Sequence, residues 1–295
     1  MQSMTLLPAE WQTWIRNNLA RGCLPYEMAQ KMADSGIAAN LAEQAIREAN
    51  AAQNADKLNP AAQQQAPAAQ AQAAYAMESP RLPQAGNVIR TNDRDVRVSM
   101  RLSNPIVALF DNFMSHEECD ELVHLSRAKL SRSAIVDPVT GLNQIIDARS
   151  SYGTYFSLAE TDFIARLDRR IAEAMHWPME NGEGIQILHY PVGGEYKAHF
   201  DYFPATDPGS AMHLAKGGQR VSTLVMYLND VEEGGGTAFP SLHLTVTPKK
   251  GSAAYFEYCN SQGQVDPRSL HSGMPIIQGE KWIATKWMRQ GVYSA

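Results

Sequence analysis

The sequence predicts an α+β fold: a double-stranded β-helix (jelly roll) core with buttressing helices, preceded by a small all-α unit at the N-terminus. Three observations predict it. Short strand-like segments with Gly/Pro turns fill the C-terminal half, which is typical of a β-sandwich or barrel. Two helical segments with capping signals precede them. The first fifty residues show helical spacing alone.

Length and composition bound the class of protein. A chain of 295 residues can hold one large domain, or one medium domain and a small one, and 44% hydrophobic residues suffice for a core. A formal net charge of −5 without a dominant basic patch predicts no nucleic-acid partner. Three scattered cysteines make neither a disulfide framework nor a zinc site. They suit a reducing compartment.

Targeting signals are not evident. The N-terminus lacks a basic region, a long apolar run and a small-residue cleavage site, so we do not interpret it as a signal peptide. No apolar run is long enough to span a bilayer, so no membrane association is expected. We therefore expect a cytoplasmic protein.

Residues 1–50 are predicted to form a small helical domain. Three segments carry apolar residues at helical spacing: Trp11, Trp14, Ile15 and Leu19; Met28 and Met32; Leu41, Ala45 and Ile46. We interpret this stripe as core packing. The unit is also a candidate for binding a protein partner. Residues 51–89 are Ala/Gln/Pro-rich and poor in aliphatic side chains, which predicts a linker.

A second, larger domain is placed at residues 90–295. Ser115 with Glu118, and Ser157 with Glu160, are capping-box pairs that predict the starts of two helices. Strands are expected to follow, in the segments GIQILHYP, EYKAHFDYF, RVSTLVMYLND, LTVTP, GSAAYFEY and KWIATKWMRQGVYS.

The segment YPVGGEYKAHFDYFP places an imidazole and a carboxylate two residues apart. Side chains two apart on a strand share a face, so His199 and Asp201 project together. They supply two-thirds of the facial triad of non-haem Fe(II) oxygenases. His271, from another strand, completes it. A chelating 2-oxo acid and dioxygen can occupy the open positions, and Lys281 can pair with the far carboxylate of that acid.

Residues from about 105 to 295 resemble the prolyl 4-hydroxylase branch of the 2-oxoglutarate- and Fe(II)-dependent dioxygenases. Four segments carry the resemblance, in order: DARSSYGTYF, LHYPVGGEYKAHFDYF, GGQRVSTLVMYLNDVEEGGGTAFP and SLHSGMPIIQGEKWIATKWM. The resemblance implies hydroxylation of a peptidyl proline with release of succinate and CO2. The implied cofactors are Fe(II), 2-oxoglutarate and dioxygen, with ascorbate as reductant.

The resemblance also implies roles for individual residues. Iron ligands are His199, Asp201 and His271, and the C5 carboxylate of 2-oxoglutarate binds Lys281. Tyr190 and Thr237 match positions near the cosubstrate, and Tyr196 and Arg220 match positions near a peptide substrate. Tyr202 is expected to line the same substrate-binding groove as Tyr196 and Arg220. Arg149 either forms an ion pair on the surface or lines that groove. Arg289 stands where the family often has a histidine, which is a departure in the substrate region.

Two other functions stay open at this point. The first is a related oxygenase that acts on a free amino acid or on another side chain. The second is a metal-free jelly roll that only binds a partner. Iron-dependent formation of succinate separates both oxygenases from the binding protein, and analysis of the product separates the two oxygenases.

Overall fold

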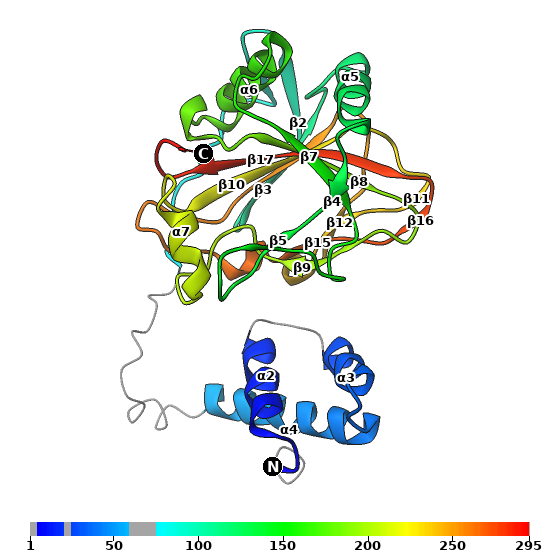
Figure 1. The fold of residues 1–295 in the computed structure, drawn as a ribbon. Coiled ribbons are helices and arrows are strands. Elements are labelled where there is room, and N and C mark those ends of the chain that lie inside the picture. The colour runs from blue at the N-terminus through cyan, green and yellow to red at the C-terminus, as the bar shows by residue number, and fades with distance from the viewer. Residues whose placement is uncertain (1–4, 21–24, 59–74, 295) are drawn as a thin grey trace. The chain divides into compact units, whose positions relative to one another are not determined.

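The computed structural model describes residues 5–20, 25–58 and 75–294 (Figure 1). The chain divides into two compact units, Met1–Gln72 and Ala73–Ala295. Within the described residues, no helix combines the length and the apolar content that crossing a bilayer requires.

The first unit consists of helices α2 (Ala9–Ala20), α3 (Pro25–Asp34) and α4 (Ala39–Leu58). Its core is formed by the buried side chains Leu7, Ile15, Met28, Met32, Ala42, Ala45 and Ile46. Trp11 and Trp14 pack at its edge with their rings 5.2 Å apart. The predicted apolar stripe is therefore core packing.

The predicted linker, residues 51–89, differs from the structure at both of its ends. Helix α4 continues to Leu58, because alanine and glutamine are good helix formers. At the other end, residues 75–89 pack on the second unit. Leu82 is buried in its core, and the backbone N–H groups of Arg81 and Leu82 donate to Glu257 Oε1 at 3.0 and 3.4 Å. The stretch 59–74 lies outside the described residues.

The second unit is built on a nine-stranded sheet. Its strand order is β1-β2-β3-β14-β10-β17-β8-β7-β4, and the paired neighbours are antiparallel. The strands are β1 (Val88–Arg90), β2 (Asp95–Ser103), β3 (Ile106–Asp111), β4 (Ser131–Arg132), β7 (Tyr152–Phe156), β8 (Ile185–Tyr190), β10 (Arg220–Tyr227), β14 (Ala253–Glu257) and β17 (Lys281–Arg289).

A smaller sheet of four strands faces it, in the order β13-β12-β15-β9. These strands are β9 (Tyr196–His199), β12 (Thr237–Phe239), β13 (Leu244–Val246) and β15 (His271–Gly273). Two further pairs complete the unit: β5 (Ile135–Val136) with β6 (Asn143–Gln144), and β11 (Glu233–Gly234) with β16 (Ile276–Gln278).

Strand periodicity separates two cores on either side of the large sheet. On β10, Val225 and Tyr227 face the smaller sheet, together with Phe239 and Val246 from that sheet. The intervening Leu224 and Met226 belong to the other core. That outer core is covered by Leu122 of α5 (His116–Arg127) and by the apolar side of α6 (Asp162–Met175). Figure 1 shows both helices on the same side of the sheet. The predicted jelly roll with buttressing helices is confirmed.

One capping prediction is confirmed and the other is displaced. Ser115 caps α5 in a complete capping box with Glu118. Helix α6 instead begins at Asp162 with Thr161 as its N-cap, while Glu160 Oε2 accepts from the Ser157 N–H in the preceding turn. Helix α7 (Ala211–Leu214) and the 3-10 turns Met179–Asn181, Pro208–Ser210, Pro240–Leu242 and Pro267–Ser269 lie in connections.

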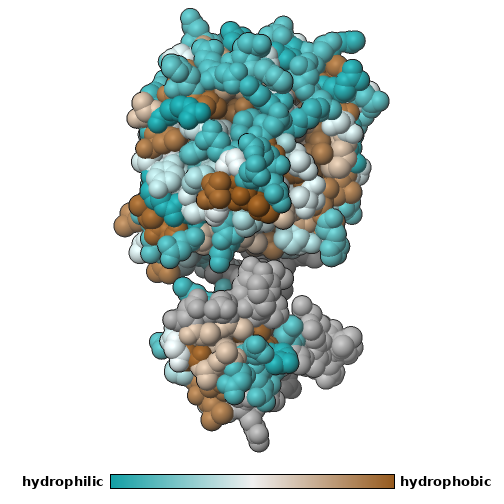
Figure 2. Space-filling model, turned by 90° about the vertical axis from the view of Figure 1, so that its right-hand side faces the viewer, coloured by the Kyte–Doolittle hydropathy of each residue, from teal (hydrophilic) through white to brown (hydrophobic). Residues whose placement is uncertain are grey.

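The surface of the molecule seen in Figure 2 is mostly hydrophilic, with small hydrophobic areas between the polar residues.

Candidate metal centre and cosubstrate pocket

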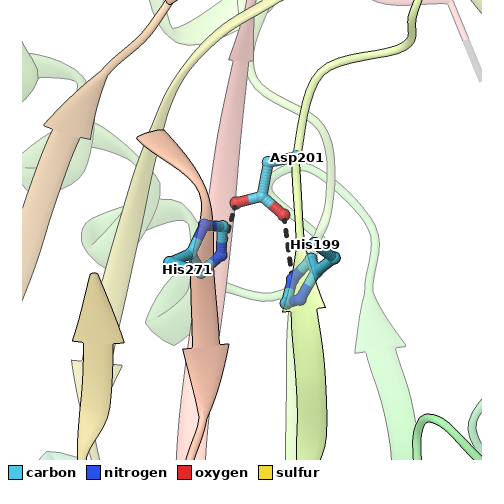
Figure 3. Close-up of side chains that lie close together, drawn as sticks. All are labelled: His199, Asp201 and His271. Carbon is cyan, nitrogen blue, oxygen red and sulfur yellow. Dashed lines mark ion pairs between the residues drawn. The ribbon is translucent and has the colours of Figure 1, made fainter. Parts of the chain in front are cut away.

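Antiparallel pairing of β9 with β15 places two histidines opposite each other. His199 and His271 are direct cross-strand partners, and Asp201 follows just beyond the end of β9 (Figure 3). Asp201 Oδ1 lies 3.7 Å from His199 Nε2, and Oδ2 lies 3.5 Å from His271 Nε2. The three ligand atoms lie within 4.8 Å of one another. The predicted triad therefore assembles at one end of the small sheet.

Backbone carbonyls set the tautomer of both imidazoles. His199 Nδ1 lies 2.8 Å from the Lys197 carbonyl oxygen, and His271 Nδ1 lies 2.9 Å from that of Ser269. A carbonyl oxygen can only accept, so each Nδ1 carries the proton. Each Nε2 then presents its lone pair toward Asp201. Such hydrogen bonds are the usual way in which a protein orients metal-binding histidines.

Burial sets the charge state of the triad. It lowers the pKa of His199 to about 3, and the neighbouring His271 adds to that effect, so this imidazole is neutral at physiological pH. Burial opposes ionisation of Asp201. The imidazoles of His271 and His199, the Arg220 guanidinium and the Thr223 hydroxyl nevertheless hold its pKa below the ordinary value. A neutral imidazole beside an ionised carboxylate is ready for a divalent cation.

Aromatic rings enclose the triad. The Tyr196 ring stacks on the His199 imidazole with centroids 3.6 Å apart, and the Phe256 and Phe239 rings lie 4.7 and 5.8 Å from that of His271. These rings exclude water from one side of the metal position. Two imidazoles and one carboxylate are the donor set of non-haem Fe(II) sites, so the residues fit that ion.

A buried cation lies in the interior between the sheets. Lys281 is 2% exposed, and its ammonium donates to the Gly235 carbonyl at 2.5 Å. Among the described residues no carboxylate forms an ion pair with it. Burial lowers its pKa to about 7. An unpaired buried ammonium is costly, and an anionic ligand group would remove that cost.

Two tyrosine rings, those of Tyr190 and Tyr227, lie beside this cation. Tyr190 is the register partner of Lys281 on the neighbouring strand β8. The Tyr227 ring centroid is 5.8 Å from Lys281 Nζ, and the Tyr227 hydroxyl donates to Thr237 Oγ1 at 2.9 Å. The structure thus places Tyr190 and Tyr227 beside Lys281 and Thr237 on the Tyr227 hydroxyl, while the role of Tyr190 and Thr237 near the cosubstrate stays a prediction.

Comparisons with known proteins agree with this geometry. Residues 185–289 match the pattern of the 2OG-Fe(II) oxygenase superfamily. The chain is 36% identical over 208 residues to a probable prolyl 4-hydroxylase 3 of Arabidopsis thaliana, covering 64% of this chain and 71% of that protein. The chain belongs to the 2OG-Fe(II) oxygenase superfamily. Its similarity to prolyl 4-hydroxylase 1 of the same plant is 39% over 223 residues, covering 68% and 77% of the two chains.

The similarity to a solved structure supports the same family assignment. The viral collagen prolyl hydroxylase of Paramecium Bursaria Chlorella virus-1, in its 2OG complex, superposes with a TM-score of 0.50 at 29% identity. The match covers 62% of this chain and 95% of the viral chain. The protein is therefore a prolyl 4-hydroxylase-like dioxygenase that uses Fe(II) and 2-oxoglutarate, with His199, Asp201 and His271 as its metal triad.

The predicted substrate residues divide into two groups. Tyr196 is partly exposed beside the metal triad. Tyr202 is buried and stacks on Phe200, with ring centroids 4.7 Å apart, so it belongs to the wall of the site. Its contacts are with the protein rather than with an open groove.

Arg220 forms an ion pair beside the metal triad. Its guanidinium donates to both carboxylate oxygens of Glu183, at 2.6 and 2.8 Å, and to the Asp201 backbone carbonyl at 3.3 Å. It lies 3.9 Å from the Trp287 ring. Three of its N–H groups are therefore engaged within the protein, and its placement near a peptide substrate stays a prediction.

Arg149 is neither a surface pair nor a free groove residue. It is 7% exposed and donates to Ser151 Oγ, the Ala134 carbonyl and Gln186 Oε1. Its guanidinium lies 4.8 Å from the Tyr196 ring centroid. Arg149 therefore supports Tyr196, which in turn stacks on His199.

Arg289, the departure from the family pattern, shares Glu183 with Arg220. Its Nε donates to Glu183 Oε1 at 2.6 Å, and its Nη1 donates to the carbonyls of His213 and Gly218. This arginine holds the connection between β9 and β10 against β17. Sequence reasoning missed Glu183 because nothing local marks a lone acidic residue as the counterion of two distant arginines.

Proposed function

We propose that this oxygenase hydroxylates proline within a peptide segment of another protein. Similarity to curated prolyl 4-hydroxylases over most of their length carries the proposal. Bound Fe(II), with 2-oxoglutarate and dioxygen, supplies an oxidation that puts one oxygen atom into succinate and the other into a C–H bond of the substrate. The residues of this chain bind, orient and shield those reactants.

Lys281 is proposed to bind the C5 carboxylate of 2-oxoglutarate. Its buried ammonium has no carboxylate partner among the described residues, and the Tyr227 ring, whose hydroxyl donates to Thr237, lies 5.8 Å from it. A charge-assisted hydrogen bond to a ligand carboxylate would satisfy the ammonium. Tyr190, beside Lys281 in register, is proposed to close the same pocket.

An exposed apolar surface near β9 favours a peptide over a free amino acid. Val139, Leu142 and Ile145, on and beside the β5–β6 hairpin, are 68%, 62% and 61% exposed, and Met212 of α7 is 48% exposed. Exposed apolar side chains gathered on neighbouring loops are a common feature of interaction sites.

Hydrogen bonds connect this surface to the metal strand. The hairpin contacts the α7 region through the Gly209 N–H, which donates to the Pro138 carbonyl, and through the contact of His213 Nε2 with the Gly141 carbonyl. The chain after the hairpin pairs with β9 at Arg149 and Tyr196. Figure 1 shows the hairpin, α7, β9 and β15 at one end of the unit. An extended peptide lying there would present a side chain to the triad.

The test offers proline-containing peptides and free L-proline side by side with Fe(II) and 2-oxoglutarate. The proposal predicts an added oxygen atom on proline of the peptide, found by fragment mass spectrometry, with succinate formed in equal amount. Preferential oxidation of the free amino acid, or oxygen on another residue, would favour the related oxygenase instead.

We also propose that ascorbate serves as reductant, which an assay with and without it can test.

We propose a cellular setting and a role for the helical unit as well. The setting is cytoplasmic, consistent with free thiols at Cys119 and Cys259, and cell fractionation can test it. The helical unit Met1–Gln72 binds a protein partner rather than taking part in the chemistry, because all three residues of the metal triad lie in the other unit.

A further inference from the structure

A buried hydroxyl contacts the metal carboxylate from the large sheet. Thr223 Oγ1, on β10, donates to Asp201 Oδ2 at 2.7 Å. Thr223 is fully buried, and its side chain shares the inner face of β10 with Val225 and Tyr227. Asp201 lies beyond the end of β9, so no ladder hydrogen bond of that strand fixes its conformation. The Thr223 hydroxyl therefore contacts the Asp201 carboxylate from the opposite sheet.

A second hydroxyl sets the direction of this contact. Tyr258, which follows β14, has its OH 2.9 Å from Thr223 Oγ1. The threonine hydroxyl has one proton, and that proton is donated to the carboxylate. The Tyr258 hydroxyl must therefore be the donor to Thr223. The three groups form a one-way series of hydrogen bonds, Tyr258 to Thr223 to Asp201.

We propose that Thr223, oriented by Tyr258, is a positioning residue that holds the Asp201 carboxylate in its metal-binding rotamer. Without the bond, the carboxylate can rotate away from the Nε2 atoms of His199 and His271, which lie 3.7 and 3.5 Å from its two oxygens. Partners of this kind outside the metal ligands tune affinity for the ion. The inference needs the metal triad but not a proline substrate, so failure of the substrate proposal would leave it standing.

The experiment measures binding of Mn(II) to the full chain by the loss of the free-ion electron paramagnetic resonance signal. Thr223→Val keeps the shape of the side chain and removes the hydroxyl. We expect its dissociation constant for Mn(II) to rise about 10- to 100-fold. Thr223→Ser keeps the hydroxyl and should stay close to the wild type. Rescue by serine separates positioning from simple filling of space.

A neighbouring hydroxyl provides the control. Ser222 is also fully buried on β10 but points to the other face of the sheet, so Ser222→Ala should leave Mn(II) binding unchanged. Wild-type affinity in Thr223→Val, or equal loss in the valine and serine variants, would overturn the proposal. If Thr223→Val does not fold, Tyr258→Phe tests the proposal in its place. We expect this variant to bind Mn(II) more weakly than the wild type. Unchanged binding would contradict the proposed series of hydrogen bonds from Tyr258 to Asp201.

Discussion

His199 and His271 are direct partners across the β9–β15 ladder, so a single register fixes the separation of two metal ligands. A shift of one residue in this pairing would turn one imidazole to the opposite face of the sheet. The ladder shifts by one residue between this pair and the next one, Gly273 with Tyr196. On its other edge β15 pairs with β12, Gly273 with Thr237 and Ser272 with Ala238. The two histidine ligands are therefore placed by sheet pairing, whereas Asp201 lies just beyond the end of β9.

Removal of the Lys281 ammonium should weaken binding of 2-oxoglutarate and spare the metal. Lys281→Met keeps the bulk of the side chain but loses the charge-assisted contact, so we expect the apparent KM for 2-oxoglutarate to rise by about 10-fold or more. Mn(II) affinity measured on the same variant should match the wild type. An unchanged KM would show that another cation holds the carboxylate.

Binding of 2-oxoglutarate should weaken as the pH rises above about 7. The pKa of Lys281 is about 7 in the free protein, and a bound carboxylate favours the charged amine and raises that pKa. Binding therefore takes up a proton above pH 7, and the dissociation constant rises by up to about 10-fold per pH unit until the raised pKa is reached. Below about pH 7 the amine of the free protein is already charged, so the dissociation constant no longer changes with pH for this reason.

Calorimetric titrations between about pH 6 and about pH 9 can measure this dependence. Lys281→Arg is the control, because arginine stays charged throughout and its residual binding should lose this pH dependence. A wild-type dissociation constant that is flat above pH 7 would contradict the assignment.

Arg220→Ala should destabilise the protein. The substitution removes two charge-assisted hydrogen bonds from Glu183, which keeps Arg289 as its ion-pair partner, so we expect a loss of about 2 kcal/mol. Denaturant unfolding should show this loss in the free energy of unfolding. Arg47→Ala, which breaks an exposed pair with Glu43, is the matched control and should change stability little. A fully stable Arg220→Ala with reduced peptide affinity would instead indicate that Arg220 contacts the peptide substrate.

Two truncations should behave differently. Removal of Met1–Gln72 keeps residues 75–89 on the oxygenase unit, so we expect a folded protein that still binds Mn(II). Removal of residues 1–88 also strips Leu82 from the core and two N–H donors from Glu257. Loss of a buried leucine alone costs about 2–5 kcal/mol. Equal thermal unfolding of the two truncated proteins would show that this segment contributes nothing to stability.

The sequence predicted the residues whose signal is local or shared with a family. The His199/Asp201 spacing, His271 and Lys281 were identified in this way, and the strands that carry them follow from periodicity. Residues whose role depends on a distant partner were misplaced or missed. Arg220 and Arg289 share Glu183, and Thr223 reaches Asp201 across the interior. Such pairings depend on sheet order, which spacing along one chain does not reveal.

The predicted boundaries of the linker differ from the structure for a related reason. An Ala/Gln-rich composition is compatible with helix as well as with linker, and α4 uses it to extend to Leu58. Leu82 is a single apolar residue among prolines and glutamines, so no periodic pattern marked it as core.

The most direct test of the account is succinate formation from 2-oxoglutarate with added Fe(II), in the wild type and in Asp201→Ala. Asp201 supplies the only carboxylate of the triad, and loss of a ligand should lower turnover by about 100-fold or more. Circular dichroism should confirm that the variant is folded. Iron-dependent succinate formation by the wild type, absent from folded Asp201→Ala, is the predicted result. Wild-type turnover in Asp201→Ala would contradict the metal assignment and the reaction built on it.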